Sequence, residues 1–548
     1  MSDSYDYVIV GAGSAGAVLA NRLSADPANR VCVIEAGPPD RSPFIHIPVG
    51  VARLFFDPKY NWQFWSKPQA GAADRKIYVP RGKTLGGSSS INGMIYTRGD
   101  PTDYDDWAEM GAKGWSFRDV LPYFKRSENN PDYKGSPYHG QGGELHVQYL
   151  DMYSPLCEVL FKAAEDHQYR QIDDFCGPSH EGFSRRQFTI RNGVRQSTAT
   201  AFLKPARKRP NLTVLTDTLT RRVLLDGDRA TGVEVEHAGT VREIAADREV
   251  ILCAGTINSP QILMLSGIGP GEELARHRIE CRRDLPGVGR NLREHISVAV
   301  QYSSPTTVPY GLSWRTVPWY GWQALKYATT RKGIFNNPLL HAGGFIKTDP
   351  ALSRPDVQLI LMPAHRDAKG RVGFGHGYAL IAIVLRPESH GNITLGSSDP
   401  RDAPVIDFKF FDDSSDLSTL FKGVRIARQL LESDHFAPYR GEEILPGSQV
   451  RDQAGIEDFI RKNSSTVFHP VGTCRMGDGP ECVVGSDLRV KGFHGLRVAD
   501  ASVMPTLIGG NTNAPAIMIG EKASDMILGI GPPEAFDPAE QPERSQAA

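Results

Sequence analysis

The stretch from Tyr5 to Gly37 constrains the fold more than any other part of the chain. It opens with an apolar run and passes through Gly11-Ala12-Gly13-Ser14-Ala15-Gly16. It then continues as an amphipathic segment to Leu23 and returns through Val31–Ile34 to Glu35. This pattern predicts a strand, a glycine turn, a helix and a second parallel strand that ends in an acid.

The spacing of the three glycines indicates a dinucleotide-binding turn. Gly11 permits the tight turn, Gly13 lets a pyrophosphate approach the backbone, and Gly16 lets the helix pack close to the strand. The helix N-terminus offers free N–H groups to phosphates, and Glu35 stands at the offset from which an acid binds an adenosine ribose. The predicted contacts are Gly11, Gly13, Ser14, Ala15, Gly16, Glu35 and Ala36.

Composition excludes several classes of function. A chain of 548 residues is expected to form two or more domains, and a net charge of -1 gives no field that would attract nucleic acid. Its seven cysteines are scattered without C-x-x-C spacing, which favours reduced thiols over disulfides or a zinc site, and we expect no metal. The first strand leaves no room for a secretory signal and no apolar run reaches about twenty residues. We therefore expect a cytoplasmic protein with at most peripheral membrane attachment.

A second run of small residues extends from Arg81 to Gly93 and is flanked by Leu85, Ile91, Met94 and Ile95. So many small residues cannot form a core element, but they suit a backbone that passes close to a flat ligand and offers it N–H and hydroxyl donors. A flexible surface linker is the alternative, although the flanking apolar residues argue against it.

Later segments predict two different sheets. Strands at 212–215, 222–225 and 232–235 precede a strand at 249–253, which leads through Gly255 into a helix and is expected to join the first sheet. Residues 300–460 contain apolar strands at 357–361 and 378–384, typical of an antiparallel sheet in a substrate domain. Aromatics between Tyr310 and Tyr327 are expected to be core more often than pocket.

We therefore predict an α/β fold, α+β in part, with a Rossmann-like nucleotide domain and a second domain on an antiparallel sheet. The nucleotide domain is predicted at 1–150, 205–300 and 462–530, and the substrate domain at 151–204 and 301–461. Residues 531–548 are predicted to be a flexible tail.

Two stretches near the C-terminus carry the chemical argument. The first surrounds His469, and the second runs from Asp500 to Pro515 and precedes an apolar helical pattern. Because proline suits the first helical position, Pro515 is predicted to open the helix, with Ala514 at the cap and the carboxamide of Asn513 free to face a ligand.

These motifs together resemble the glucose–methanol–choline (GMC) flavoprotein oxidoreductases over essentially the whole chain, and most nearly their bacterial choline- and aliphatic-alcohol-dehydrogenase-like branch. The resemblance implies FAD as cofactor. Beyond the N-terminal contacts, it implies that FAD lies against Arg81, Gly82, Leu85, Gly86, Gly87, Ser88, Asn92, Gly93, Met94, Ile95, Val223, Asp500, Ala501, Asn513 and Ala514.

The same resemblance implies a catalytic pair of His469 and Asn513. Alcohol oxidation removes a proton from oxygen and a hydride from carbon, and an imidazole can accept that proton near neutral pH. An amide can hold the same oxygen without competing for the proton. Asn511 is the competing choice, but an asparagine after Gly510 also suits a turn.

Three departures from the family pattern refine the expectation. Ile91 stands where some relatives carry a histidine that binds FAD covalently, so we expect non-covalent FAD. His341 stands where choline-oxidising relatives carry a glutamate, and Phe468 where some furan oxidisers have tryptophan. His341 and Phe468 are predicted to contact substrate.

The expected function is therefore FAD-dependent oxidation of a primary alcohol, neutral and aliphatic or aryl, to the aldehyde. Hydride passes to flavin N5, and oxygen or a quinone accepts the electrons. Choline dehydrogenase-type activity and a redox-neutral hydroxynitrile lyase on the same fold are the alternatives. A non-catalytic flavin-binding protein is a third class, disfavoured because both catalytic positions are filled.

Overall fold

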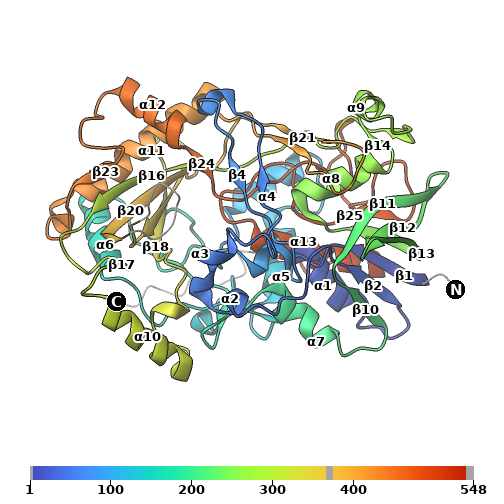
Figure 1. The fold of residues 1–548 in the computed structure, drawn as a ribbon, viewed down its shortest axis with the longest axis horizontal. Helices are drawn as coiled ribbons and strands as arrows, with labels where there is room; N and C mark the ends of the chain where they lie inside the picture. The colour runs from blue at the N-terminus through green and yellow to red at the C-terminus, as the bar shows by residue number, and fades with distance from the viewer. Residues whose placement is uncertain (1–3, 366–373, 538–548) are drawn as a thin grey trace.

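The computed structural model describes residues 4–365 and 374–537. Two large sheets organise them, one on each side of the molecule in Figure 1. The helices α1 (Ser14–Leu23), α5 (Phe117–Ser127) and α13 (Asn513–Leu528) lie between the two sheets. The first has strand order β10–β2–β1–β13–β12–β11, and β25 also pairs with β13. Its strands are β1 Ser4–Val10, β2 Val31–Ile34, β10 Leu212–Leu215, β11 Thr218–Asp226, β12 Arg229–His237, β13 Thr240–Leu252 and β25 Leu496–Val498.

The predicted N-terminal unit is confirmed. β1 leads into α1 (Ser14–Leu23) and returns in β2, which pairs with β1 in parallel. All four residues of β2 are buried, because a parallel strand is covered on both faces and is therefore apolar throughout. β13 lies on the other side of β1 and leads into α8 (Gly255–Leu265), so the second strand–glycine–helix junction shares this sheet as predicted.

The second sheet is antiparallel, as predicted, with strand order β23–β16–β20–β19–β18–β7. Its strands are β7 Gly182–Arg185, β16 Ile296–Ser303, β18 Ala342–Ile346, β19 Val357–Met362, β20 Gly375–Val384 and β23 Glu443–Leu445, and β17 Gly311–Leu312 and β24 Ser465–Thr466 pair at its margins. The helix α11 (Ser414–Glu432) packs on one face, where Gly423 approaches Ala382. Side chains that alternate with Ala382 therefore face the opposite way.

The other elements connect and cover the sheets. The remaining helices are α2 Pro43–His46, α3 Val51–Leu54, α4 Pro101–Glu109, α5 Phe117–Ser127, α6 Leu156–Asp166, α7 Lys204–Ala206, α9 Gly271–Arg276, α10 Val317–Thr330, α12 Gln453–Asn463 and α13 Asn513–Leu528. Short ladders join β3 Phe64–Trp65 with β4 Tyr78–Val79, β5 Glu128–Asn129 with β6 Leu145–His146, β8 Ile190–Arg191 with β9 Val194–Arg195, β14 Ile268–Gly269 with β15 Arg283–Asp284, and β21 Asn392–Thr394 with β22 Val405–Asp407. None of the described helices is long and apolar enough to span a bilayer.

The sheets do not follow the predicted domain boundaries residue by residue. The boundary at residue 300 falls inside β16, and β24, predicted in the nucleotide domain, pairs with β16. Part of the predicted flexible tail is ordered. Phe536 is buried, its N–H donates to the Arg118 carbonyl at 2.9 Å, and its ring lies 5.3 Å from that of Tyr138. Residues 538–548 of that tail lie outside the described residues.

The aromatic segment before and within α10 also differs from expectation. Tyr327 is buried, but Trp314 and Trp322 are 86% and 61% exposed. The prediction that this segment contributes its aromatics mainly to the core is wrong for these two tryptophans.

Candidate active site

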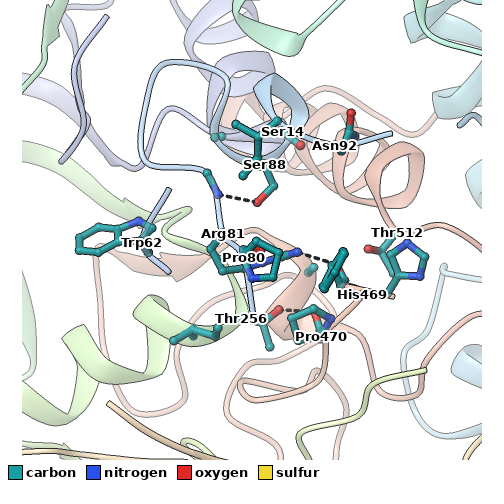
Figure 2. A pocket seen from close by; sticks show the side chains of 18 of the residues that line it. Ser14, Trp62, Pro80, Arg81, Ser88, Asn92, Thr256, His469, Pro470 and Thr512 are labelled. Atoms are coloured by element: carbon teal, nitrogen blue, oxygen red, sulfur yellow. Dashed lines mark hydrogen bonds between the residues drawn. The ribbon is translucent and has the colours of Figure 1, made fainter. Parts of the chain in front are cut away.

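One cavity of about 480 Å³ joins the first glycine turn to His469 (Figure 2). It lies where the N-terminal β–α–β unit, the loop from Arg81 to Ile95 and the start of α13 meet the second sheet. The predicted contacts that line it are Gly11, Gly13, Ser14, Ala15, Glu35, Ala36, Arg81, Gly82, Gly87, Ser88, Asn92, Gly93, Met94, Ile95, Asp500, Ala501 and Asn513, together with Phe468 and His469.

The phosphate end is built from two helix N-termini. Gly13 is the N-cap of α1, and no acidic residue stands in the first turn of α1 or α13. The two starts meet where Ser14 Oγ donates to Asn513 Oδ1 at 2.7 Å. Both helices therefore direct free N–H groups and the positive ends of their dipoles towards the same part of the cavity, which favours an anion there.

Two glycines allow the backbones to approach this closely. A Cβ on Gly16 would lie 2.0 Å from the Gly11 carbonyl oxygen, so any side chain would push α1 away from β1. A Cβ on Gly87, whose φ is +52°, would lie 2.8 Å from Gly13 Cα. The loop after Arg81 thus rests directly on the first glycine turn, which fits the prediction that both contact one ligand.

The ribose end is marked by Glu35. Its carboxylate accepts the N–H of Ala12 at 3.1 Å and that of Gly37 at 2.9 Å. Burial nevertheless raises the pKa of Glu35 to about 7, against the effect of these two hydrogen bonds. A buried carboxylate that lines a cavity is well placed to accept hydroxyl donors from a sugar.

Five predicted cofactor residues do not line the cavity: Gly16, Leu85, Gly86, Val223 and Ala514. The side chains of Leu85 and Ala514 are buried in the core. The backbone N–H of Gly86 donates to the Ala12 carbonyl at 2.8 Å, and the N–H of Val223 donates to Ser266 Oγ at 2.8 Å. The residues of β11 that line the cavity are Thr218, Leu219 and Thr220, near the carboxyl end of β2. Val223 stands three residues further along the strand and does not line the cavity.

Backbone hydrogen bonds of His469 and of the preceding Phe468 fix the position of His469. Its N–H donates to Glu294 Oε1 at 2.8 Å, and the preceding carbonyl of Phe468 accepts from Arg81 Nη2 at 2.6 Å. Phe468 has a φ of +71°, an unfavourable conformation for a phenylalanine that turns the chain just before the histidine. Figure 2 shows the His469 side chain beside Thr512, with Arg81 reaching towards it.

A second histidine fixes the tautomer of His469. His295 Nε2 lies 3.0 Å from the Leu385 carbonyl and 3.2 Å from the Ile508 carbonyl. Because carbonyl oxygens only accept, this nitrogen carries the hydrogen. Burial lowers the pKa of His295 to about 3, so the ring is neutral and its Nδ1 is an acceptor. His469 Nδ1, 3.0 Å away, must therefore donate, which leaves the lone pair of His469 on Nε2.

Asn511 approaches that lone pair, and Asn513 does not. Asn511 Nδ2 lies 3.1 Å from His469 Nε2, and Thr97 Oγ1 donates to Asn511 Oδ1 at 3.3 Å, which orients the amide. Helix α13 begins at Asn513, with Thr512 as N-cap, two residues before the predicted start. Asn513 therefore lies inside the first turn with its carboxamide engaged by Ser14, and the structure corrects the expectation that it is free beside His469.

Buried charges surround this pair. Burial, then His295 and Arg81, lower the pKa of His469 well below its usual range. Burial lowers the pKa of Arg81 to about 10, and burial raises the pKa of Glu294 to about 7. His469 is consequently unprotonated at neutral pH and able to accept a proton.

One wall of the cavity is apolar. Ala299, Ile381 and Ile360 are paired directly across β16, β20 and β19, and all three line the cavity. Leu340 and Val467 line it as well. The only carboxylates among the described lining residues are Glu35 and Asp500, and both contact the nucleotide-domain turns through Ala12 and Gly255.

His341 is not part of this wall, contrary to prediction. It is fully buried outside the cavity lining, where Nδ1 accepts the N–H of Ser154 at 2.8 Å and Nε2 contacts Asn337 Oδ1 at 2.6 Å. Burial lowers its pKa to about 3. A neutral histidine with both nitrogens engaged is a structural residue at this position.

The sequence interpretation missed three contributors: His295, Glu294 and Thr97. Glu294 and His295 follow the small-residue turn at Gly287–Leu292 after one intervening residue, and an acid beside a histidine after such a turn is the available signal. Nothing local in the sequence distinguishes Thr97.

Comparison with known proteins agrees with this geometry. Family models described as GMC oxidoreductase match residues 5–297 (the N-terminal model) and 387–520 (the C-terminal model). The chain is 41% identical to an alcohol dehydrogenase [acceptor] of Pseudomonas putida, over 96% of both chains. It is also 41% identical to an oxygen-dependent choline dehydrogenase of Brucella anthropi, again over 96% of both.

A solved structure extends the likeness to three dimensions. A formate oxidase of Aspergillus oryzae, studied for modification of its FAD, superposes with a TM-score of 0.89 at 28% identity, covering 96% of this chain and 99% of the other. The family and this FAD-containing neighbour support FAD as the cofactor. The chain belongs to the GMC oxidoreductase family and is an oxidoreductase of EC class 1.1.

Proposed function

We propose that this chain oxidises a neutral primary alcohol to the aldehyde, with dissociable FAD, His469 as general base and Asn511 as the residue that holds the alcohol oxygen. The observation that carries the proposal is the pair of contacts made by His469. Its Nδ1 donates to His295, which leaves Nε2 unprotonated, and this Nε2 lies beside Asn511 at the cavity wall.

The residues present fit FAD. The two helix N-termini suit its pyrophosphate, Glu35 suits its ribose, and the loop from Gly87 to Ile95 lies between them and His469. Bound FAD supplies a hydride acceptor at flavin N5. Ile91 lines the cavity and carries no nucleophile at the position where some relatives attach FAD, which supports non-covalent binding.

His469 and Asn511 have different roles at the alcohol oxygen. A substrate hydroxyl placed between them would donate its proton to His469 Nε2 and accept a hydrogen bond from Asn511 Nδ2. Since the pKa of His469 is low, the base is neutral before turnover, and proton acceptance is favourable only as the hydride leaves carbon. The amide donor stabilises the developing alkoxide without competing for its proton.

The apolar wall supports an uncharged substrate. Ala299, Ile381 and Ile360 offer a surface that favours aliphatic or aryl groups. The choline dehydrogenases among the relatives make choline the second candidate. Against it, the carboxylates among the described lining residues, Glu35 and Asp500, contact the nucleotide-domain turns, so neither stands at the apolar wall to pair with a quaternary ammonium.

The test is anaerobic reduction of the FAD-loaded enzyme by a panel containing 1-butanol, benzyl alcohol and choline, followed by flavin absorbance. We expect bleaching by the neutral alcohols, and His469→Ala should slow it about a hundredfold or more with FAD retained. His390→Ala, at an exposed histidine, is the matched control.

Three results would contradict the proposal: near-normal reduction of His469→Ala, bleaching by choline alone, or cyanohydrin cleavage without any bleaching. Reoxidation of the reduced enzyme by air or by a soluble quinone then distinguishes an oxidase from a dehydrogenase.

A further inference from the structure

The strand β17 and the helix α10 carry a cluster of large apolar side chains in solvent. We define the α10 face as Leu312, Trp314, Val317, Trp322, Leu325 and Phe374, which are between 44% and 86% exposed. Leu312 and Phe374 are neighbours in a β-bridge, so the cluster continues from the helix onto the edge of the second sheet. Figure 1 shows α10 projecting at the periphery of the molecule, below β17.

One side of α10 presents apolar side chains to solvent. Its buried side chains are Gln323 and Tyr327, while Pro318, Trp322 and Leu325 are exposed. The latter three are spaced by four and then three residues, which places them on one side of a helix. The helix thus turns a polar glutamine inwards and an apolar stripe towards solvent, an arrangement that indicates an interaction surface.

Cations stand close to the α10 face in the sequence. Between Ser303 and Thr348 the chain contains no aspartate or glutamate but carries Arg315, Lys326, Arg331, Lys332 and Lys347. Lys347 pairs with Glu181 at 3.0 Å, and the other four stand before, within or just after α10. The whole chain has a net charge of -1, so this local charge of four cations without an acid in the segment is a distinct feature.

We propose that the α10 face docks on the surface of a lipid bilayer that contains anionic lipids. Tryptophan prefers the interface between headgroups and acyl chains, and lysine and arginine next to it reach the anionic headgroups. An apolar helix face bordered by cations is typical of proteins that lie on a membrane without spanning it.

Charge favours a bilayer over a second copy of the chain. A two-fold dimer built on this face would set the patch against itself, because such an interface is self-complementary. Arg315, Lys326, Arg331 and Lys332 would then oppose the same four cations of the other copy, which costs free energy. An anionic headgroup layer neutralises them instead.

The docking surface is linked to the cavity through the chain. After Thr330 the chain forms the turn Ile334–Asn336 and then supplies Pro338 and Leu340 to the cavity lining. A docked α10 would hold this wall segment near the lipid. The proposal does not depend on the reaction assigned above, because it rests on the surface alone.

The test is flotation of the FAD-loaded enzyme with vesicles of phosphatidylcholine, alone or mixed with phosphatidylglycerol. We expect the wild type to float with the mixed vesicles, and Trp322→Glu with Leu325→Glu to lower the partition coefficient more than tenfold. Val241→Glu is the matched control, since Val241 is 48% exposed on β13 of the other sheet, and it should bind like the wild type.

A second pair of variants tests the cations. Arg315→Ala with Lys326→Ala should lower the partition coefficient for mixed vesicles by about 30-fold, and high salt should have a similar effect. All variants should keep their FAD and their turnover in solution, which shows that they are folded.

Either of two results would overturn the proposal. One is equal or absent binding for the wild type and the Trp322→Glu, Leu325→Glu variant. The other is a dimer in sedimentation equilibrium that this variant converts to a monomer, without vesicle binding by the wild type. The second result would assign the α10 face to a subunit interface.

Discussion

Asn511 and Asn513 stand two positions apart but contact different ends of the cavity, so replacing each with alanine should separate two functions. Asn511→Ala removes the donor 3.1 Å from His469 Nε2, which is the donor proposed for the developing alkoxide. A hydrogen bond to a group that gains charge contributes about 2–3 kcal/mol, so the rate constant of flavin reduction should fall about 30- to 150-fold. Asn513→Ala instead removes the acceptor of Ser14 Oγ at the phosphate end. Loss of that neutral hydrogen bond, worth about 1 kcal/mol, should weaken FAD binding about fivefold and leave reduction of the FAD-saturated enzyme unchanged.

The assay is stopped-flow reduction under anaerobic conditions with FAD in excess, together with a separate FAD titration of the apoprotein. Asn511→His is the control for chemistry rather than packing, because an imidazole N–H can replace the amide donor and the family uses a His–His pair as well as His–Asn. It should recover part of the lost rate. Slow reduction in Asn513→Ala combined with normal reduction in Asn511→Ala would refute the assignment and restore Asn513 as the partner of His469.

Three further changes test other parts of the site. His295→Ala should slow flavin reduction about tenfold with FAD retained, because His469 loses the acceptor that fixes its tautomer. An unchanged rate constant for flavin reduction in this variant would contradict the role. The pKa of Glu35 is about 7 in the protein alone, and ribose hydroxyls favour its ionised form. FAD affinity, measured by fluorescence quenching, should therefore weaken as the pH falls below about 7, and Glu35→Gln should abolish that pH dependence. Gly16→Ala would place a Cβ 2.0 Å from the Gly11 carbonyl oxygen and should lower the free energy of unfolding by about 1–3 kcal/mol in thermal or urea denaturation; an unchanged Tm would show that α1 can shift freely.

The N-terminal unit could be predicted from the sequence because its signals are local. Apolar runs, a glycine turn at fixed spacing and an acid at the end of β2 each depend on residues close in the chain, and β1, α1 and β2 follow them. The strands of the second sheet could likewise be predicted from local apolar runs, although an apolar run does not by itself distinguish antiparallel from parallel pairing. The boundary predicted at residue 300 falls inside β16, which pairs with β20, β23 and β24 of the second sheet, because strand pairing across the chain leaves no local mark at that residue.

The site could be predicted only in part, because side-chain direction depends on contacts distant in the sequence. Proline at 515 suggested a helix start there, yet α13 begins at Asn513, and this difference of two residues exchanges the roles of the two asparagines. Analogy with a glutamate of relatives predicts His341 in the pocket, but its contacts with Ser154 and Asn337 hold it away from the cavity lining. Exposure of Trp314 and Trp322 could not be read from composition, because tryptophan is apolar in either setting.

The start of α13 couples the two ends of the cavity mechanically. Asn511 lies beside His469, Thr512 is the N-cap of α13, and the next residue, Asn513, begins the helix and meets Ser14. Since a helix moves as a rigid body, displacement of its first turn by an ill-fitting cofactor would also displace the amide beside the base. Correct seating of the pyrophosphate is therefore a condition for correct placement of Asn511. An adenine- or phosphate-truncated flavin should then reduce the rate constant for alcohol oxidation more in the wild type than in Asn511→Ala, where the coupled group is already missing.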